Sequence, residues 1–252
     1  MLCPNPTNSM NTAKDHYDQQ LASVYSWMSG NSEAAIKRNH DLFCQLEIDS
    51  APRGLAVDLG AGSGFQSIPL AELGFSVVAV DFCAPLLSEL SDRANNLSIR
   101  TVQDDILNFS KHIEEQAQVI VCMGDTLTHL ESLSSVQSLL LSFGSTLATS
   151  GKLILTFRDY VCVEPQGTQR FIPVRSDEST ILTCFLEYRE DIVEVYDLLY
   201  RKEGERWLLN ASSYPKLRLD KNWVCEQLQK AGLQVLRNEI INGMICIVAQ
   251  KI

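Results

Sequence analysis

The sequence predicts an α/β fold: a mostly parallel sheet with helices on both faces, interrupted by an antiparallel β insertion. Along residues 54–157, short apolar runs alternate with stretches of helical periodicity. Between residues 170 and 212, successive β-like runs leave no room for a helix. The last two runs of the chain are joined by Asn242-Gly243, a dipeptide that favours tight hairpins. The alternation indicates a parallel sheet because each parallel pair needs a crossover, usually a helix.

The N-terminal region is expected to contain helices and no strand. Residues 1–11 are predicted to be a disordered tail. Residues 12–47 are predicted to form a helical cap of two segments, because their apolar positions recur at helical spacing and Gly30 interrupts the pattern. Ser32 followed by Glu33 is typical of a helix start.

The remaining elements follow in order after Pro52. The alternating part predicts strands at 54–58, 76–80, 97–102, 118–123 and 152–157, and helices at 65–73, 84–94 and 134–149. The insertion predicts strands at 170–175, 180–188, 192–201 and 206–212. A helix between Asp220 and Gly232 then precedes strands at 233–239 and 244–249. We therefore expect a core domain at 48–157 and 216–252, with the insertion at 158–215 acting as a lid or a dimer surface.

Composition excludes several classes of function. The formal net charge of −10 disfavours DNA or RNA as a partner, because affinity for phosphate backbones comes mainly from lysine and arginine. No stretch approaches the roughly 20 apolar residues of a membrane span. The eight cysteines include no Cys-x-x-Cys pair, which is typical of buried thiols in a reducing cytosol, so a cytoplasmic location is expected. The four histidines lack metal-ligand spacing, and no metal is expected.

A glycine-rich turn directly after the first predicted strand indicates a nucleotide-like ligand. The turn reads Asp58-x-Gly60-x-Gly62-x-Gly64, and it leads into a helix. A dinucleotide fingerprint would need its third glycine where Phe65 stands. Asp81 ends the second strand, where a carboxylate can accept hydrogen bonds from ribose hydroxyls. Asp81 alone does not separate a dinucleotide from another nucleoside ligand.

The Asp58–Gly64 pattern resembles the first motif of class I S-adenosylmethionine (SAM) dependent methyltransferases. The resemblance implies a seven-stranded, Rossmann-like sheet with a C-terminal antiparallel hairpin, and SAM as cofactor. In that family an Asp and the apolar residue after it hold adenine at the third strand tip; Asp105 with Ile106 matches best, and Asp104 is an alternative. The implied cofactor-binding residues are Tyr17, Tyr25, Asp58, Gly60, Ala61, Gly62, Gly64, Asp81, Phe82, Asp105, Ile106, Met123 and Gly124.

The two tyrosines of that set come from the cap. The leading helix of the family often closes over the SAM carboxylate with a Tyr-Asp and a later Tyr-x-Trp, which Tyr17 and Tyr25 match. The alternative is that both are core aromatics of an amphipathic helix.

Two further segments are similar to glycine and sarcosine N-methyltransferases. The segment 124–130 resembles their Gly-Asn-Ser-Phe-Ala-His-Leu, and Arg158-Asp159-Tyr160 resembles their Arg-Asn-Tyr, whose arginine grips the substrate carboxylate. Asp replaces Asn in both segments, which we expect to favour a cationic or hydroxylated acceptor. Arg158 could instead pair with Asp159 or with an acidic strand tip, and His129 is either a general base, an orienting group or a packed side chain. The predicted catalytic residues are His129 and Arg158. The predicted substrate-binding residues are Asp125, His129, Arg158, Tyr160, Arg170 and Tyr214.

These observations predict an enzyme that methylates N or O of a small molecule, with neither nucleic acid nor membrane as partner and with a homodimer left open. One alternative is an NAD(P)-dependent reductase, which Phe65 and Asp105 disfavour. Another is a catalytically silent SAM-binding or scaffold protein that uses the insertion for association.

Overall fold

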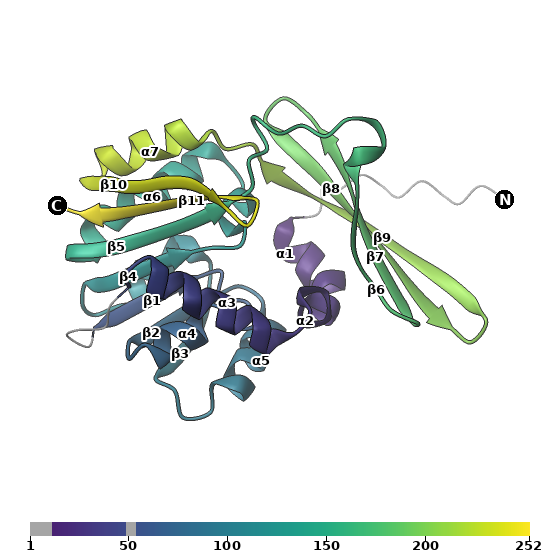
Figure 1. The fold of residues 1–252 in the computed structure, drawn as a ribbon, viewed down its shortest axis with the longest axis horizontal. Helices are drawn as coiled ribbons and strands as arrows, with labels where there is room; N and C mark the ends of the chain where they lie inside the picture. The colour runs from purple at the N-terminus through teal and green to yellow at the C-terminus, as the bar shows by residue number, and fades with distance from the viewer. Residues whose placement is uncertain (1–11, 49–53) are drawn as a thin grey trace.

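The computed structural model describes residues 12–48 and 54–252. The predicted tail at 1–11 and the strand entry at Pro52 lie outside the described residues. The described chain forms a core around one sheet, a second sheet beside it, and a helical cap between the two (Figure 1). Among the described helices, none is long and apolar enough to cross a membrane.

The core sheet has seven strands in the order β10-β11-β5-β4-β1-β2-β3. Its strands are β1 Leu55–Leu59, β2 Ser76–Asp81, β3 Ile99–Gln103, β4 Ala117–Cys122, β5 Leu147–Phe157, β10 Leu233–Ile241 and β11 Met244–Lys251. Strands β1 to β5 pair in parallel, and β11 runs antiparallel to both of its neighbours. The predicted seven-stranded, mostly parallel sheet with a terminal hairpin is therefore confirmed. Every residue of β1 is buried, as expected for a central parallel strand covered on both faces.

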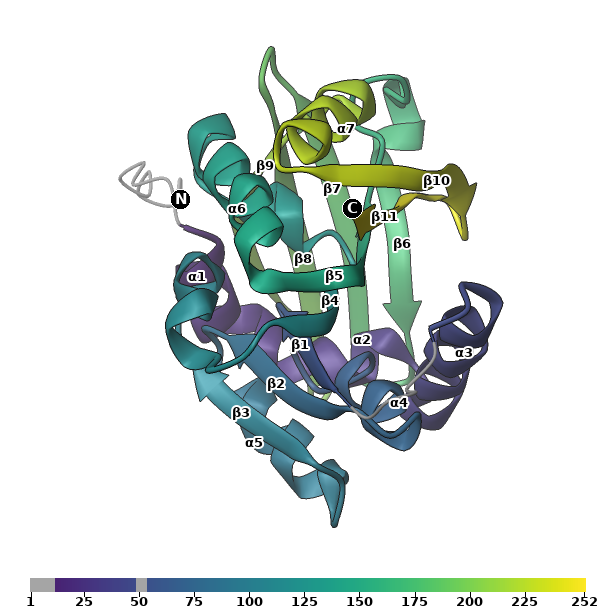
Figure 2. The ribbon, with the colours of Figure 1, turned by 90° about the vertical axis from the view of Figure 1, so that its left-hand side faces the viewer.

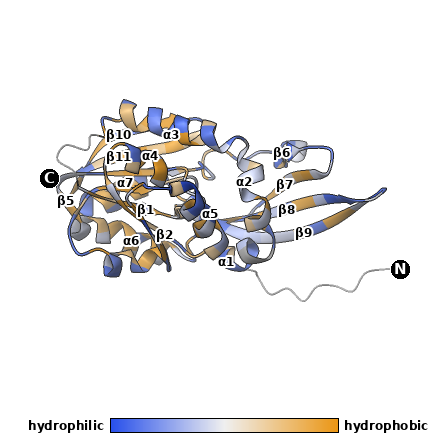
Figure 3. Cartoon of the chain, turned by 90° about the horizontal axis from the view of Figure 1, so that it is seen from below, coloured by the Kyte–Doolittle hydropathy of each residue, from blue (hydrophilic) through white to orange (hydrophobic). Residues whose placement is uncertain are grey.

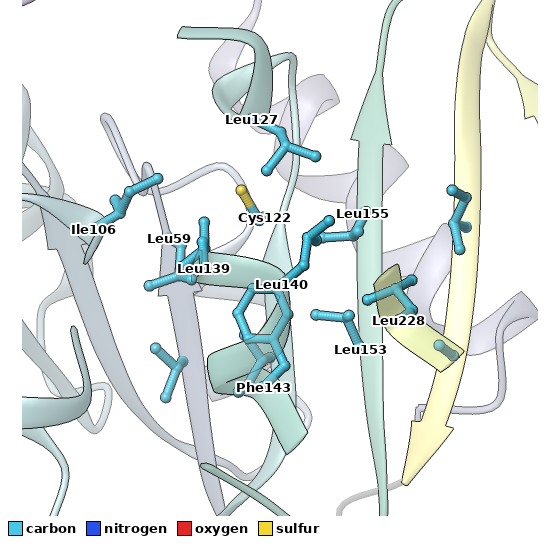
Figure 4. Packing of buried hydrophobic residues seen from close by; sticks show 14 of the residues in the cluster. Leu59, Ile106, Cys122, Leu127, Leu139, Leu140, Phe143, Leu153, Leu155 and Leu228 are labelled. Atoms are coloured by element: carbon cyan, nitrogen blue, oxygen red, sulfur yellow. The ribbon is translucent and has the colours of Figure 1, made fainter. Parts of the chain in front are cut away.

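Helices cover both faces of this sheet, as Figure 2 shows. One face packs an apolar cluster against α3 Ser32–Gln45, α4 Ser67–Glu72 and α5 Ala84–Ala94. The other packs against the short 3-10 helix η3 Ile106–His112, α6 Leu133–Thr146 and α7 Lys221–Lys230, with Phe143 and Leu228 among the buried side chains (Figure 4). The helix predicted to reach residue 149 ends at Thr146, because β5 begins directly after it.

The insertion forms the predicted antiparallel sheet, in the order β6-β7-β8-β9. After the 3-10 helix η5 Gly167–Arg170 come β6 Phe171–Ser176, β7 Thr180–Tyr188, β8 Ile192–Glu203 and β9 Arg206–Leu217. The tip of the β8–β9 hairpin is hydrophilic and extends away from the core (Figure 3). Strand β9 continues beyond its predicted end at Ser212, because an edge strand tolerates the missing N–H of Pro215. This extension brings Tyr214 and Lys216 to the core.

Of the two helical segments predicted for residues 12–47, the second forms one continuous helix, α3, and the first is broken into short pieces. The first segment, called the cap from here on, consists of α1 Ala13–His16, the π-helix η1 Tyr17–Leu21, the 3-10 helix η2 Ala22–Val24 and α2 Tyr25–Ser29. Thr12 and Asp15 form a capping box at its start, and Gly30 ends it with φ of 85°. Leu21 and Val24 pack against Leu182 and Leu199 of the insertion. The cap thus joins the two sheets above the carboxyl ends of the parallel strands (Figure 1).

Candidate active site

The glycine turn adopts a backbone that only glycine fits well. Gly60, Gly62 and Gly64 have φ of 76°, 51° and 90°. A Cβ on Gly60 would lie 2.4 Å from Cγ2 and Oγ1 of Thr126, and one on Gly64 would lie 2.2 Å from Leu90 Cδ1. The turn therefore brings bare backbone against the residues that follow β4.

Asp58 and Ala61 stabilise the glycine turn through hydrogen bonds to neighbouring residues. The buried Asp58 carboxylate accepts a hydrogen bond from Ser67 Oγ at 2.6 Å. Burial raises the pKa of Asp58 to about 7, which outweighs the opposing effect of that bond. The Ala61 N–H donates to Val80 O at 3.2 Å. Both predicted cofactor residues thus hold the turn in place by their own bonds.

Asp81 lies at the tip of β2, where the chain itself fixes its carboxylate. Oδ2 accepts from the Gly62 N–H and Oδ1 from the Cys83 N–H, each at 2.8 Å. Burial raises its pKa, against the effect of these bonds. The carboxylate is therefore oriented by the glycine turn before any ligand binds.

A cavity of about 840 Å³ opens beside Asp81, within the size range of small-molecule and cofactor sites. It brings together five of the predicted cofactor residues. They are Gly60, Asp81, Phe82, Asp105 and Ile106. Its other lining residues include Thr12 and Lys14 from the cap, Thr126 and His129 after β4, and Pro215 of β9. Core, cap and insertion all contribute to one cavity.

Asp104 and Asp105, the two alternatives at the β3 tip, have different environments. Asp104 Oδ2 is 2.7 Å from His112 Nε2, and this hydrogen bond is the main cause that lowers the Asp104 pKa to about 2. The exposed Asp105 carboxylate accepts only from the Leu107 N–H at 2.8 Å among its side-chain bonds in the described chain. Because His112 and Asn108 of η3 already bond to the Asp104 carboxylate, Asp105 stays the predicted adenine contact.

Tyr17 and Tyr25 pack beside the glycine turn and are not among the residues that line the cavity. Tyr25 Cε1 would lie 3.6 Å from a Cβ on Gly62. The Tyr17 ring contacts Phe82 and His129 edge-on, with centroids 5.5 and 5.9 Å apart. Burial raises the pKa of both phenols, that of Tyr25 to about 12, so both are uncharged at neutral pH. Both tyrosines therefore pack against other aromatic rings, and their predicted contact with the cofactor stays a prediction.

The Met123-Gly124 pair, predicted to contact the methionine part of SAM, also lies outside the cavity lining. Met123 O accepts from Thr126 Oγ1 at 2.9 Å, and the Gly124 N–H donates to Thr156 Oγ1 at 2.8 Å. Gly124 itself is exposed, with φ of 75° and open space where a Cβ would stand. A ligand could approach its backbone.

Asp125 is the centre of a buried polar cluster that includes a lysine the sequence analysis did not single out. Its Oδ1 accepts from the Arg158 N–H at 2.9 Å, and its Oδ2 accepts from Tyr160 Oη at 3.0 Å and from Lys216 Nζ at 2.6 Å. Burial would raise the Asp125 pKa, but the Lys216 charge and these bonds outweigh it and lower the pKa to about 2. Asp125 and Tyr160, predicted to bind substrate, are thus bonded to each other inside the protein.

Arg158 keeps an open guanidinium. Its side chain is 60% exposed, and its Nε lies 3.8 Å from Asp125 Oδ2. The alternative pairing with Asp159 does not occur: Asp159 Oδ1 accepts from the N–H groups of Val161 and Cys162 instead. The alternative of an acidic strand tip does occur, as the long ion pair with Asp125 just after β4. The arginine is therefore held near the cluster by its backbone and by this ion pair, and its mostly exposed guanidinium is accessible to a ligand.

Arg170 is not brought to this site. Its guanidinium carbon lies 4.8 Å from the centre of the Phe185 ring, and Phe185 pairs with Phe171 across β6 and β7. Arg170 ends η5, directly before the outer strand β6, and it is not among the residues that line the cavity, so its predicted substrate contact gains no support and stays a prediction.

Tyr214 lies between two histidines. Its ring stacks on His16 at 4.1 Å and on His129 at 5.4 Å between centroids. The fully buried His16 is fixed on both nitrogens, by Asp197 Oδ2 and by Ser212 Oγ, each at 2.8 Å. Burial raises the Tyr214 pKa, so the phenol stays protonated. The stack joins α1, β9 and the segment after β4.

His129 faces the cavity as a neutral ring. Its Nδ1 is enclosed and has no hydrogen-bond partner among the described residues. Burial, and after it the Lys216 charge, lower its pKa to about 3. His129 is therefore a weak base that can exchange a hydrogen bond with a ligand, which fits an orienting role better than proton removal.

Sequence reasoning missed His16, Asp197 and Lys216. Their hydrogen bonds join positions up to 196 residues apart, which leaves no local pattern. The only signal was a single lysine among the aromatic and apolar residues 214–217. No group of three or more His, Cys, Asp or Glu side chains that could hold a metal occurs in the described part of the chain.

The sequence matches a known protein family in one segment and individual curated proteins over a longer part of the chain. Residues 56–151 match the family described as a methyltransferase domain. The chain is 34% identical over 113 residues to the glycine/sarcosine N-methyltransferase of Aphanothece halophytica, covering 44% of this chain and 43% of the relative. It is 32% identical over 163 residues to that of Halorhodospira halochloris, covering 62% and 59%. The chain thus spans about half the length of these curated relatives.

Solved structures match over nearly the whole chain. An amino pentose methyltransferase of Micromonospora echinaspora with bound SAM has a TM-score of 0.76 at 13% identity, covering 92% of this chain and 97% of that one. A sugar N-methyltransferase of Streptoalloteichus has a TM-score of 0.74 at 10% identity, covering 100% and 98%. At these identities the likeness concerns the fold, including the insertion and cap.

Proposed function

We propose that the protein uses SAM to methylate the amino group of a small, carboxylate-bearing molecule, because residues 56–151 match the family described as a methyltransferase domain and the fold of the chain is similar to those of solved SAM-dependent methyltransferases. Two observations carry this proposal: a cavity lined by the residues expected to bind SAM, and an exposed arginine beside a neutralised carboxylate, in a cluster that is linked to the cavity-lining His129 through Tyr214. SAM supplies a methyl carbon made electrophilic by its sulfonium.

On the cofactor side, the donors and acceptors fit SAM. Asp81 would accept from the ribose hydroxyls, and Asp105 with the Ile106 backbone would hold adenine, since all three line one cavity. The bare backbone at Gly60 gives the close approach that such a ligand needs. The alternative of an NAD(P)-dependent reductase loses its support, since the glycine turn lies within the segment that matches methyltransferases.

On the acceptor side, the neutralisation of Asp125 changes the expected charge preference. The replacement of Asn by Asp suggested a cationic or hydroxylated acceptor. However, Lys216 lies 2.6 Å from Asp125 Oδ2, whereas Arg158 Nε is 3.8 Å away. The Asp125 charge is thus balanced mainly by Lys216, and the Arg158 guanidinium is left to bind a carboxylate through paired hydrogen bonds. Relatives named glycine/sarcosine N-methyltransferases support the same class of acceptor.

The basicity of His129 favours nitrogen over oxygen as the atom that is methylated. A hydroxyl must lose its proton as it attacks, which calls for a general base with a pKa near the working pH. His129 has a pKa of about 3, and the pKa values of Tyr160 and Tyr214 are raised by burial. An uncharged amine already carries the lone pair that attacks, so this site suits it.

Calorimetry tests the cofactor part first. Asp81→Ala is expected to weaken SAM binding at least about tenfold, because a charge-assisted hydrogen bond contributes about 1.5–3 kcal/mol. Equal affinity in the variant would contradict the assigned ribose contact. SAM binding without transfer of a methyl group to any component of a metabolite extract would favour the silent binding protein instead.

Arg158→Ala tests the acceptor part with glycine and sarcosine as probes. The KM for the probe is expected to rise about 10- to 100-fold while the affinity for SAM stays unchanged, because the lost contact is a bidentate ion pair. Arg158→Lys serves as the matched control, since lysine keeps the charge but lacks the planar guanidinium that makes two parallel hydrogen bonds. Its KM should lie between those of the natural protein and Arg158→Ala. An unchanged KM in Arg158→Ala would reject the carboxylate contact.

We also propose that the insertion works as a lid, because β9 carries Tyr214 and Lys216 to the site. A homodimer and a cytoplasmic location stay predictions. Sedimentation of the purified chain and fractionation of cells that produce it would test them.

A further inference from the structure

The buried Lys216 lies where its charge reaches the whole acceptor side of the site. Its side chain is 10% exposed, and Nζ donates to Asp125 Oδ2 at 2.6 Å. Nζ also lies 5.7 Å from the centre of the Tyr214 ring and 6.0 Å from that of Tyr160, in the geometry of cation–π contacts. Because Tyr214 stacks on His129, one aromatic ring separates the lysine from a cavity-lining side chain.

Lys216 adds positive potential that Asp125 does not fully cancel at His129. The charge of Lys216 lowers the His129 pKa more than the charge of Asp125 raises it. Arg158 adds a second cation beside the single Asp125 carboxylate. The cluster therefore holds two cations and one anion. A third cation entering this region would be repelled.

The charged and titratable groups that face this region come from every element packed around it. They are His16 and Tyr17 of the cap, Asp81 of β2, Asp125 and His129 after β4, Arg158 and Tyr160 after β5, Cys184 of β7, Glu194 and Asp197 of β8, and Tyr214 and Lys216 of β9. Asp197 pairs with His16, and Asp81 is bonded to backbone N–H groups on the cofactor side. The buried Glu194 pairs in register with Pro215, so its side chain lies on the opposite face of the sheet from Lys216. Among the described residues, Asp125 is thus the carboxylate that forms an ion pair with Lys216.

We propose that Lys216 is a specificity-determining residue that makes the acceptor site take its amine uncharged and reject the ammonium form. The inference rests on the proposed function. In water most of a simple amine carries a proton at neutral pH and has no lone pair to attack with. Repulsion by Lys216 leaves that proton in solvent when the amine binds. The nitrogen lone pair then forms the new N–C bond as the S–CH₃ bond breaks, its electron pair stays on sulfur, and the product ammonium loses a proton to water.

Proton release on binding is the direct measurement. Glycine is titrated into protein loaded with S-adenosylhomocysteine, which has no methyl group to give, in buffers of different ionisation enthalpy near pH 7. About one proton released per glycine bound is expected for the natural protein, and none for acetate, which lacks the amine. Lys216→Met should bind glycine with little release, since Asp125 then attracts the ammonium form. Binding of glycine to the natural protein without proton release would overturn the inference.

The pH profile of methyl transfer gives a second, independent readout. At pH 7, kcat/KM of Lys216→Met should fall about 10- to 100-fold, as expected for one uncompensated charge at an intermediate dielectric constant. The deficit should shrink as the pH approaches the amine's own pKa. Lys152→Met is the matched control. Lys152 lies on β5 and donates to Leu46 O and Glu47 O, away from the Asp125 cluster. The control profile should be unchanged. A deficit of Lys216→Met that stays constant with pH would mean a merely structural role and overturn the inference.

Two further outcomes keep the test decisive. If Lys216→Met does not fold, Lys216→Gln removes the positive charge and keeps an N–H donor for Asp125 Oδ2; the same loss of proton release is then expected, and normal release would overturn the inference. If the natural protein binds SAM but neither glycine nor sarcosine, the proposed acceptor class fails as well as this inference. Proton-free binding overturns the inference alone.

Discussion

Replacing Gly60 by alanine should cost much more stability than replacing Gly62, although both have a left-handed backbone. Gly60 has φ of 76° and Gly62 has φ of 51°, so alanine is strained at either position by about 1–2 kcal/mol. They differ in the space beside them. The new Cβ at Gly60 would lie 2.4 Å from two atoms of Thr126, whereas at Gly62 the nearest atom, Tyr25 Cε1, is 3.6 Å away.

The clash sets the expected difference. Overpacking costs about 1–3 kcal/mol, so Gly60→Ala should lower the free energy of unfolding by about 2–5 kcal/mol and Gly62→Ala by about 1–2 kcal/mol. Because Thr126 lines the cavity and donates to Met123 O, its displacement should also weaken SAM binding. Urea unfolding and calorimetry measure the two effects separately.

A double-mutant cycle locates the cause. In Thr126→Ala only the Cβ remains, 2.9 Å from the new methyl group, so Gly60→Ala should cost about 1–2 kcal/mol less in that background. Equal costs for Gly60→Ala and Gly62→Ala, or the same cost of Gly60→Ala with and without the threonine side chain, would refute the reasoning from the structure.

Two further predictions concern buried titratable groups. Burial raises the pKa of Asp58 to about 7, so the protonated side chain favours folding below pH 3.8 and this contribution is lost as the pH rises to about 7. Asp58→Asn should therefore be more stable than the natural chain by up to about 4 kcal/mol at pH 8, and by less at pH 5. A gain in stability that does not depend on pH would contradict this. His16→Phe keeps the stack on Tyr214 but leaves the Asp197 carboxylate without its histidine, so unfolding should cost about 2–4 kcal/mol less. Hydrogen exchange should then accelerate in the cap at residues 13–29 while β1 and β4 stay protected; equal acceleration everywhere would mean that the histidine does not specifically anchor the cap.

The order and type of the elements could be predicted because they depend on local patterns. Strands of the core are short apolar runs, helices have apolar residues at helical spacing, and Asn242-Gly243 fixes the last hairpin. The end of β9 was misplaced, since a strand at the edge of a sheet tolerates Pro215. The π and 3-10 turns of the cap were also missed. Its backbone follows contacts to both sheets, and the sequence of the cap itself does not encode them.

The cofactor side was easier to predict than the acceptor side for a related reason. Gly60, Asp81 and Asp105 each lie at the carboxyl end of a parallel strand or within two residues of it, and parallel strands bring their carboxyl ends to one edge of a sheet. The acceptor side instead depends on pairs such as Lys216 with Asp125, which are 91 residues apart in sequence. Nothing near Asp125 in the sequence indicates that its carboxylate is neutralised.

Similarity to known families also provides the least information about the acceptor side. The matched methyltransferase domain ends at residue 151, before Arg158, Tyr214 and Lys216. Removing either partner of the buried pair would leave an uncompensated charge, so Asp125 of the core and Lys216 of the insertion depend on each other. An asparagine at position 125 would carry no charge for Lys216 to balance. The residue at 216 should therefore be considered together with residue 125 wherever acceptor preference is inferred.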